Sequence, residues 1–540
     1  MLFNSQEFIF AFLPITVVVF YGLGGVSRVW ALRWLILASL FFYAWWRPLN
    51  VLLIAPSILI NFALARTLER LGQNEEQNYL SRAVLLLGIA FNVAFLGFFK
   101  YSDFIRGTIN DVFGANLVLM HLILPLGISF ITFQKIAFLI DVHAGRAKSF
   151  TLQDYGLFVL FFPQLIAGPI VHYREVMPQF HSAPCRFDRE NVAIGLTLFC
   201  FGLFKKVVLA DHIAPLVTPI YERAVTGVHF SLLVSWMAAL GFTLQLYFDF
   251  SGYTDMALGL ARLFGIRLPP NFNSPLKSSS IIDFWLRWNM TLTRFLTAYI
   301  YNPLVISLTR RRAAQGLPGV VGRKTTVGAF IYLLGFPILL TMFVSGLWHG
   351  AGYLFIIWGV VHGILLTTNH AWRLIAPRLW PNNASYIRWM TPIGFVLTFV
   401  SWIITMVLFR SPTIGAATIL LKGMIGLSGI TLPTFVYDHL GPLTGWLHHV
   451  GVVAEPVDVK SLMKWILFLM FIALACPNSL QILASYEPAL GVRPRAGEKG
   501  FIARVVEWRP SLPWAIGVSA IAVIAIYSIG GQSEFLYWQF

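Results

Sequence analysis

Residues 325–372 read TTVGAFIYLLGFPILLTMFVSGLWHGAGYLFIIWGVVHGILLTTNHAW and contain no Asp, Glu, Lys or Arg. A helix needs about 20 predominantly apolar residues to cross the hydrocarbon core of a bilayer. The stretch is therefore long enough for two crossings, and we expect them at 327–347 and 351–369. Two adjacent membrane spans, with a glycine-rich turn between them, are the first element of the fold that the sequence predicts.

The rest of the chain has the same apolar character. Hydrophobic residues make up 57% of the 540 positions and charged residues only 11%, whereas a typical soluble domain has roughly 25% charged residues. We predict an all-α polytopic membrane protein with about 11–13 transmembrane or re-entrant helices, built as a single membrane-embedded domain over residues 1–540. The other expected spans are 8–26, 31–46, 50–65, 83–99, 117–140, 194–217, 230–250, 388–409, 461–480 and 512–530.

One further apolar stretch, 155–171, differs from these spans because it contains Pro163, Gly168 and Pro169. Proline lacks the N–H that a helix interior needs, so we expect this stretch to be broken or re-entrant rather than a straight helix. Irregular backbone at membrane depth is tolerated only where protein surrounds it or water lines it.

The charge distribution predicts the orientation of the chain in the membrane. Lys plus Arg number 39 and Asp plus Glu number 23, which gives a net charge of +16. Such an excess is typical of the cytoplasmic loops of a membrane protein, so we expect no nucleic-acid partner. The basic segments 262–324 and 485–510 should be cytoplasmic, the second because of Arg493, Arg495, Lys499, Arg504 and Arg509. Segment 423–459 has no Lys or Arg, so it should be extracytoplasmic, as should the N-terminus.

His349 is the first candidate for a chemical role. It follows Trp348 and lies between Gly346 and Gly350, in the region that contains histidines but no Asp, Glu, Lys or Arg. Ionisable groups within membrane segments are costly and face a protein interior or a water-filled cavity. Histidine can take a proton from an alcohol and return it. The alternative for His349 is a hydrogen bond to a neighbouring helix, and His362 could either support His349 or simply pack.

A second group of polar residues lies near the end of the expected span 230–250. Asp249, Ser251 and Tyr253 are candidates for substrate binding, although Asp249 and Asp255 could instead cap the following helix. The 12 histidines are scattered and the three cysteines form no CxxC pair, so we expect no metal site.

The segment 283–294 completes this group. If it is a continuous helix, Trp285, Asn289 and Leu292 share one face, while Arg287 and Arg294 fall on another. An aromatic ring and an amide could then face inward, and the two arginines could face water or an anion. An amphipathic helix at the membrane interface, with its arginines toward lipid phosphates, explains the same pattern.

Several blocks resemble the membrane-bound O-acyltransferase (MBOAT) family, in particular its bacterial branch of alginate O-acetylation and teichoic acid D-alanyl transfer. The blocks that carry the resemblance are, in chain order, SFITFQ (129–134) with Asp141-Val142, FPQLIAGPI (162–170), DFSGYTDMA (249–257), NFN (271–273), FWLRW (284–288) and WHG (348–350). The resemblance covers 1–370 well and the last third weakly. The alginate branch usually has His where this chain has Asn289, and other branches have Asn there.

The resemblance implies a mostly helical fold around a central tunnel. An acyl-CoA, here acetyl-CoA, would enter from the cytoplasmic side as donor substrate, with no permanently bound cofactor, and a hydroxyl acceptor would arrive from the other side. His349 and Asn289 would be catalytic. Substrate or donor binding would fall to Trp285, Arg287, Arg294, Asp249, Ser251, Tyr253, Trp348 and His362.

The resemblance also predicts the biological setting. It implies O-acetylation of an exported or cell-surface polysaccharide of the alginate type, directly or through a periplasmic SGNH-type partner, by a multi-pass protein of the bacterial inner membrane. Residues 388–540 could form a partner-binding surface beside the 1–370 core.

Four questions remain open from the sequence. The acceptor could be teichoic acid or peptidoglycan, and the histidine could act as general base or carry the acyl group covalently. A transporter or channel would also explain the spans and the prolines, although not a histidine in a Gly-rich turn. A non-catalytic scaffold would not need that histidine.

Overall fold

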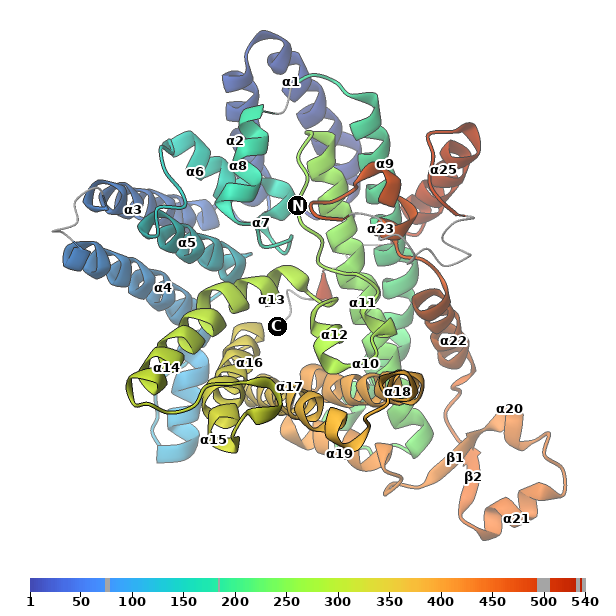
Figure 1. The fold of residues 1–540 in the computed structure, drawn as a ribbon. Helices are drawn as coiled ribbons and strands as arrows, with labels where there is room; N and C mark the ends of the chain where they lie inside the picture. The colour runs from blue at the N-terminus through green and yellow to red at the C-terminus, as the bar shows by residue number, and fades with distance from the viewer. Residues whose placement is uncertain (73–77, 183–184, 493–505, 531–534, 537–540) are drawn as a thin grey trace. The chain divides into compact units, whose positions relative to one another are not determined.

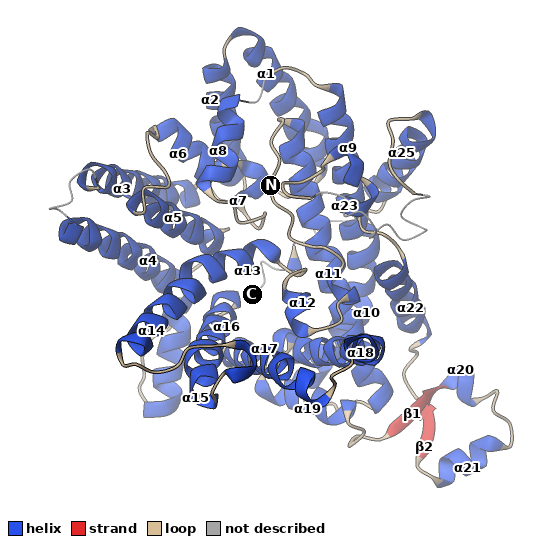
Figure 2. Ribbon diagram, in the orientation of Figure 1, coloured by secondary structure: helices blue, strands red, loops and turns tan. Residues whose placement is uncertain are grey.

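The computed structural model describes residues 1–540 except for 73–77, 183–184, 493–505, 531–534 and 537–540. Helices dominate the described chain, as Figures 1 and 2 show. Eight helices among the described residues are long and apolar enough to cross a membrane: Phe8–Val26, Leu49–Leu71, Asn78–Phe113, Arg189–Val225, Leu232–Leu263, Val327–His349, Tyr353–Leu379 and Asn383–Arg410. The prediction of an all-α polytopic membrane protein is therefore confirmed.

The chain divides into two compact units. The first consists of Met1–Phe204, Ser251–Asn271 and Ser479–Phe540. Its elements are η1 (Phe8–Phe12), α1 (Leu13–Val26), α2 (Arg28–Ala44), α3 (Leu49–Leu71), α4 (Asn78–Phe113), α5 (Ile128–His143), α6 (Leu152–Leu160), α7 (Phe162–Leu165), α8 (Tyr173–Ser182), α9 (Arg189–Phe204), the second part of α11 (Leu232–Leu263), α23 (Ser479–Ile482), η8 (Ala484–Tyr486) and α25 (Leu512–Tyr527).

The second unit consists of Lys205–Phe250 and Phe272–Asn478. Its elements are η3 (Lys205–Ala210), α10 (Asp211–Val225), the first part of α11, η4 (Pro275–Lys277), α12 (Ile281–Trp285), α13 (Met290–Leu296), η5 (Thr297–Tyr301), α14 (Asn302–Ala314), η6 (Gly322–Lys324), α15 (Val327–Phe330), η7 (Ile331–Gly335), α16 (Phe336–His349), α17 (Tyr353–Leu379), α18 (Asn383–Arg410), α19 (Ile414–Met424), β1 (Ile430–Pro433), α20 (Thr434–Tyr437), α21 (Leu443–His449), β2 (Val452–Glu455) and α22 (Lys460–Ala475). That residues 1–540 act as one domain stays a prediction.

Most expected spans coincide with helices, and two details differ. Four of the spans fall on helices shorter than 18 residues, namely α2, α5, α22 and α25. The expected span 117–140 is wrong in its first half, because the chain from 114 to 127 is not helical and α5 begins only at Ile128. Pro125 precedes a turn there, and Gly127 has a φ of 68°, which a right-handed helix cannot contain.

The stretch 155–171 is broken, as its prolines predict. Helix α6 ends at Leu160, α7 is one turn long, and 166–172 contains no helix. Pro163 lies in the first turn of α7, where its missing N–H costs nothing. Of the basic residues expected in 485–510, Arg493, Arg495, Lys499 and Arg504 lie outside the described residues.

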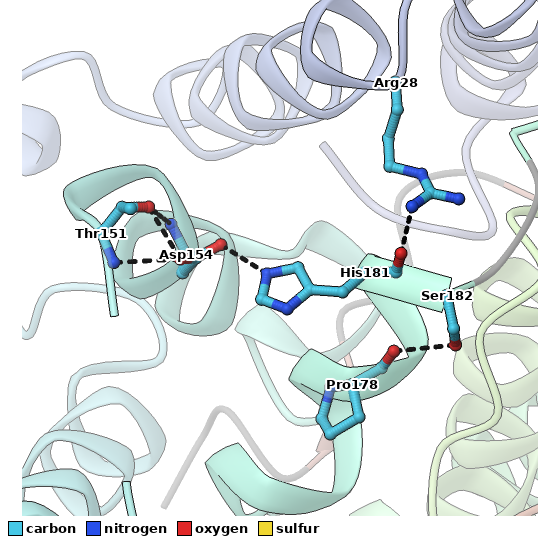
Figure 3. Close-up of polar contacts among 6 residues, drawn as sticks. All are labelled: Arg28, Thr151, Asp154, Pro178, His181 and Ser182. Atoms are coloured by element: carbon cyan, nitrogen blue, oxygen red, sulfur yellow. Dashed lines mark hydrogen bonds and ion pairs between the residues drawn. The ribbon is translucent and has the colours of Figure 1, made fainter. Parts of the chain in front are cut away.

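A polar cluster in the first unit fixes the start of α6 (Figure 3). Thr151 and Asp154 form a reciprocal capping box, in which Asp154 Oδ2 accepts from Thr151 Oγ1 at 2.7 Å. The other carboxylate oxygen lies 2.9 Å from His181 Nε2 in α8, and Arg28 donates to the His181 carbonyl. Burial raises the pKa of Asp154, but the bonds from His181 and Thr151 outweigh it and hold that pKa below its usual value. The cluster thus joins α2, α6 and α8.

The second unit contains the only strands of the described chain, which the sequence did not predict. Strands β1 and β2 are parallel, with Ile430 opposite Val452 and Pro433 opposite Glu455. The Glu455 carboxylate is buried and accepts hydrogen bonds from Ser231 and Thr431, each at 2.6 Å. These bonds attach the small β1–α20–α21–β2 segment, drawn in orange in Figure 1, to the start of α11.

Candidate active site

Two glycines bring α16 and α17 into direct backbone contact. A Cβ atom on Gly346 would lie 3.0 Å from the Gly359 Cα atom, and a Cβ atom on Gly359 would lie equally close to Gly346. Real Cβ atoms rarely approach so closely, so only glycine allows this crossing. The close crossing sets the distance between the end of α16, which carries His349, and the first turns of α17.

His349 is the last residue of α16, and its side chain is buried among aromatic rings. Its imidazole centroid lies 4.9 Å from the Trp358 ring, 5.0 Å from Trp348 and 5.2 Å from Phe409. The chain leaves the helix at Gly350, where a Cβ atom would collide with the Phe355 ring. The ring contacts restrict the rotation of the imidazole.

His362 is completely buried in α17 and is linked to α18 by a hydrogen bond. Its Nε2 atom lies 3.0 Å from Thr405 Oγ1, and the Thr405 hydroxyl donates to the Trp402 carbonyl at 2.8 Å. Because the hydroxyl hydrogen is used there, Thr405 must accept from His362, which assigns the proton to Nε2. Trp358 lies between the two histidines, with its centroid 4.6 Å from that of His362. His362 therefore packs on a ring that also contacts His349, and its predicted roles in supporting His349 or binding substrate stay predictions.

Asn289 does not lie within a continuous helix, so the expectation of one helix over 283–294 is wrong. Helix α12 ends at Trp285, and α13 begins at Met290. Asn289 itself has φ 42° and ψ 52°, a left-handed conformation that interrupts a right-handed helix and that Asn tolerates better than most residues. The predicted inward face is nevertheless buried, since Trp285, Asn289 and Leu292 are each 5% exposed or less.

The amide of Asn289 is a buried polar group without a hydrogen bond. In the described part of the chain neither Oδ1 nor Nδ2 of this side chain has a partner, although the residue is only 1% exposed. Leaving a buried amide unpaired costs about 1–3 kcal/mol, so most such groups in folded proteins are paired. The side chain is thus available to bind a ligand.

The other site residues predicted near Asn289 lie in different surroundings. The Trp285 ring joins the aromatic cluster, 5.4 Å from His362 and 5.8 Å from Trp358. Arg287 is partly exposed, and its Nε atom donates to Asp283 at 2.8 Å. Arg294 lies in the last turn of α13. The structure therefore brings Trp285, Trp348, His349 and His362 into one connected cluster, whereas Arg287 is held by a carboxylate.

Asp249, Ser251 and Tyr253 lie inside α11, so the alternative that Asp249 and Asp255 cap the next helix is wrong. Asp249 is buried in the second unit and forms an ion pair with Lys206. Ser251 and Tyr253 are buried in the first unit, where the Tyr253 ring stacks on Phe3 at 4.9 Å. Their predicted role in substrate binding stays a prediction.

The sequence reasoning missed the residues that α18 contributes to the cluster, namely Trp402, Thr405 and Phe409. Trp402 is 1% exposed and lies 4.8 Å from Trp288, while Phe409 packs on His349. Their spacing of i, i+3 and i+7 places them on one helix face, and that pattern in the expected span 388–409 could have identified them.

Comparison with known proteins identifies the family to which the chain belongs. The family model described as MBOAT, membrane-bound O-acyltransferase family, matches residues 144–316. The peptidoglycan O-acetyltransferase of Helicobacter pylori is 38% identical over 460 residues, which cover 80% of this chain and 81% of that protein. The "Probable alginate O-acetylase AlgI" of Pseudomonas aeruginosa is 36% identical over 77% of this chain and 73% of its own length.

A third relative is more distant. The teichoic acid D-alanyltransferase of Bacillus subtilis is 28% identical over 52% of this chain and 67% of its own length. The relatives differ in the acceptor that their names give, but all are named for the transfer of an acyl group. The chain belongs to the membrane-bound O-acyltransferase family, and it is a multi-pass membrane O-acyltransferase.

Proposed function

We propose that the protein transfers an acetyl group from acetyl-CoA, bound from the cytoplasmic side of the bacterial inner membrane, to a hydroxyl on the extracytoplasmic side. The acceptor is an exported or cell-surface polysaccharide, reached directly or through a periplasmic SGNH-type partner. The names of two relatives, a peptidoglycan O-acetyltransferase and an alginate O-acetylase, support acetyl transfer to a polysaccharide. Peptidoglycan, alginate-like polymers and teichoic acid remain the acceptors to compare.

One observation carries this proposal. Two buried groups with complementary chemistry lie in the second unit: the imidazole of His349 among aromatic rings, and the Asn289 amide without a hydrogen bond. An imidazole can move a proton near neutral pH, and an amide N–H can stabilise an oxyanion. Acyl transfer from a thioester to a hydroxyl needs both.

In the proposed reaction one proton moves from the acceptor hydroxyl to His349 and then to the leaving group. His349 takes the proton of the acceptor hydroxyl while the hydroxyl oxygen attacks the thioester carbonyl carbon. The carbonyl oxygen becomes an oxyanion, to which Asn289 Nδ2 donates a hydrogen bond. The tetrahedral intermediate then breaks its carbon–sulfur bond, and the leaving thiolate receives the proton from His349. Aromatic rings around the imidazole limit the water that could hydrolyse the thioester.

The donor requires cationic groups for its phosphates. The segment 262–324 carries the arginines that we assign to the cytoplasmic face, including Arg310 and Arg311, which are exposed at the end of α14. Guanidinium groups suit phosphate oxygens. To bind a phosphate of the donor, Arg287 would first have to break its hydrogen bond to Asp283.

The test is CoA release from acetyl-CoA by the detergent-purified protein, compared with His349→Ala and with longer acyl-CoAs. We expect release by the wild type that rises when the acceptor polymer is added, and nearly none from the variant. Equal release from both proteins would exclude His349 as the base. The proposed donor would be excluded if acetyl-CoA were inactive and another acetyl donor supported acetylation of the added polymer.

A further inference from the structure

The turn that carries Asn289 is connected by hydrogen bonds to the end of α22, far along the chain. The Asn273 backbone N–H donates to the Arg287 carbonyl at 3.0 Å, two residues before Asn289. Asn478 then holds Asn273, because its Nδ2 atom donates to Asn273 Oδ1 at 3.1 Å and to Ser274 Oγ at 2.8 Å. The connection therefore runs from Asn478 through Asn273 to the Asn289 turn.

A second bond joins the same two segments. The Lys277 ammonium donates to the Cys476 carbonyl at 2.7 Å, and Cys476 is the C-cap residue of α22. A cation is favoured at a helix C-terminus, where the last carbonyl groups lack partners within the helix. Loop 271–280 is thus attached to the end of α22 at two points.

The Asn289 turn needs such support because its own structure is weak. It lies between a helix of five residues and a helix of seven, and short helices have little stability of their own. Asn289 also has a positive φ, a conformation that residues other than glycine rarely adopt. A group that stabilises a transition state must be held to within about 0.5 Å by the residues around it.

We propose that Asn478 is a positioning residue, which holds the Asn273 backbone against Arg287 and thereby orients the amide of Asn289 for the reaction. Lys277 acts in the same way, because its bond to the Cys476 carbonyl holds the same loop against the end of α22. This inference rests on the proposed role of Asn289. It assigns a role in the reaction to the C-terminal third, in which the sequence predicts no site residue.

The first experiment compares Asn478→Leu with Asn478→Asp in acetyl-CoA turnover. Leucine cannot donate or accept a hydrogen bond, so kcat should fall about tenfold or more with KM for acetyl-CoA unchanged. Aspartate should keep most of the activity, because the Asn273 amide can rotate to donate and the Ser274 hydroxyl can donate as well. A merely structural role would lower the yield of folded protein without separating kcat from KM.

The second experiment is a double-mutant cycle with Asn289→Gly, which removes the amide and permits the positive φ. If Asn478 acts through Asn289, Asn478→Leu should cause no further loss of kcat in the Asn289→Gly background. An equal loss in both backgrounds would overturn the inference, as would wild-type kcat in Asn478→Leu alone.

A measurement that needs no activity separates this inference from the proposed function. Hydrogen–deuterium exchange at residues 281–296 should become faster in Asn478→Leu and stay near the wild-type rate in Asn478→Asp. Unchanged exchange in Asn478→Leu would refute the connection whatever the enzyme's substrate is. If Asn289→Gly keeps full turnover but exchange responds as expected, the connection from Asn478 to the Asn289 turn stands, and the role of both residues in the reaction fails.

Discussion

Lys206 Nζ lies 2.6 Å from Asp249 Oδ1 and 2.8 Å from Asp211 Oδ1, and both the Lys206 and Asp249 side chains are buried. Lys206 lies in the π-helix η3, within the helix that runs from Arg189 to Val225. A buried ion pair leaves an uncompensated charge when one partner is removed, which is why such pairs are hard to change singly.

We therefore expect Asp249→Asn to lower the unfolding temperature of the purified protein clearly. Removing one partner of a buried pair costs about 3–5 kcal/mol, and Asp211 will offset part of that loss. The double variant Lys206→Met/Asp249→Leu should unfold at a higher temperature than Asp249→Asn. If Asp249 also binds substrate, as the sequence predicts, Asp249→Asn will raise KM as well. An unchanged unfolding temperature in Asp249→Asn would contradict the stabilising role of the ion pair.

The oxyanion role of Asn289 is tested by two substitutions. Asn289→Gly removes the amide without backbone strain, and we expect a loss of roughly 100-fold or more in kcat, equivalent to about 3–4 kcal/mol of transition-state stabilisation. Asn289→Ala should lose slightly more, because alanine also disfavours the positive φ. Steady-state rates of CoA release measure both variants. Full activity in Asn289→Gly would exclude this role.

The crossing of α16 and α17 predicts a sensitive position beside a tolerant one. Gly359→Ala places a methyl group against the backbone of α16, which should cost about 1–3 kcal/mol and displace Trp358 from His349. Gly352→Ala is the matched control, because its nearest atom, in the Phe355 ring, would lie 3.6 Å away. Thermal unfolding and kcat should both fall in Gly359→Ala and stay near wild type in Gly352→Ala. Equal behaviour of the two variants would contradict the crossing.

Asp154 gives the protein an acid-sensitive contact. Its pKa is lower in the folded protein than in the unfolded chain, where it is about 3.9. The stabilisation is therefore fully present above the unfolded pKa and is lost as pH falls through the folded pKa. Asp154→Asn should lower the unfolding temperature at pH 7, and the difference from wild type should shrink as the pH is lowered below 4. A difference that does not depend on pH would mean that the carboxylate charge is unimportant.

The predicted orientation is testable by labelling in intact cells. In a background with Cys185, Cys200 and Cys476 replaced by alanine, Leu443→Cys should react with a membrane-impermeant maleimide, because Leu443 is exposed and its segment is assigned to the extracytoplasmic side. Arg311→Cys should react only after the cells are opened. Labelling of Arg311→Cys in intact cells would reverse the assignment.

Composition and hydrophobic length were enough to predict the fold class. Runs of apolar residues such as 325–372 must be helical in a bilayer, since no other open structure pairs all its backbone groups there. The same reasoning failed at 117–140, where apolar residues continue but Pro125 and Gly127 prevent a helix. Hydrophobicity predicts burial in lipid or protein, and it does not by itself fix the local backbone.

The burial of Trp285, Asn289 and Leu292 could be predicted from the sequence, and the backbone of their segment only in part. The inward face of Trp285, Asn289 and Leu292 was read from helical spacing and is buried, although the helix is interrupted at Asn289. A left-handed conformation at one residue does not change the spacing of apolar residues along the chain, so that spacing could not reveal it.

By itself, the sequence determined that the chain is a polytopic helical membrane protein with a histidine in a charge-free segment, because lipid solvation acts on each span separately. Only the tertiary structure decided which groups meet. Trp358 comes to His349 through the contact of Gly346 with Gly359, and Asn478 comes to the Asn289 turn across about 190 residues of chain. Such contacts depend on side-chain shape and hydrogen-bond direction between distant segments, which local patterns do not encode.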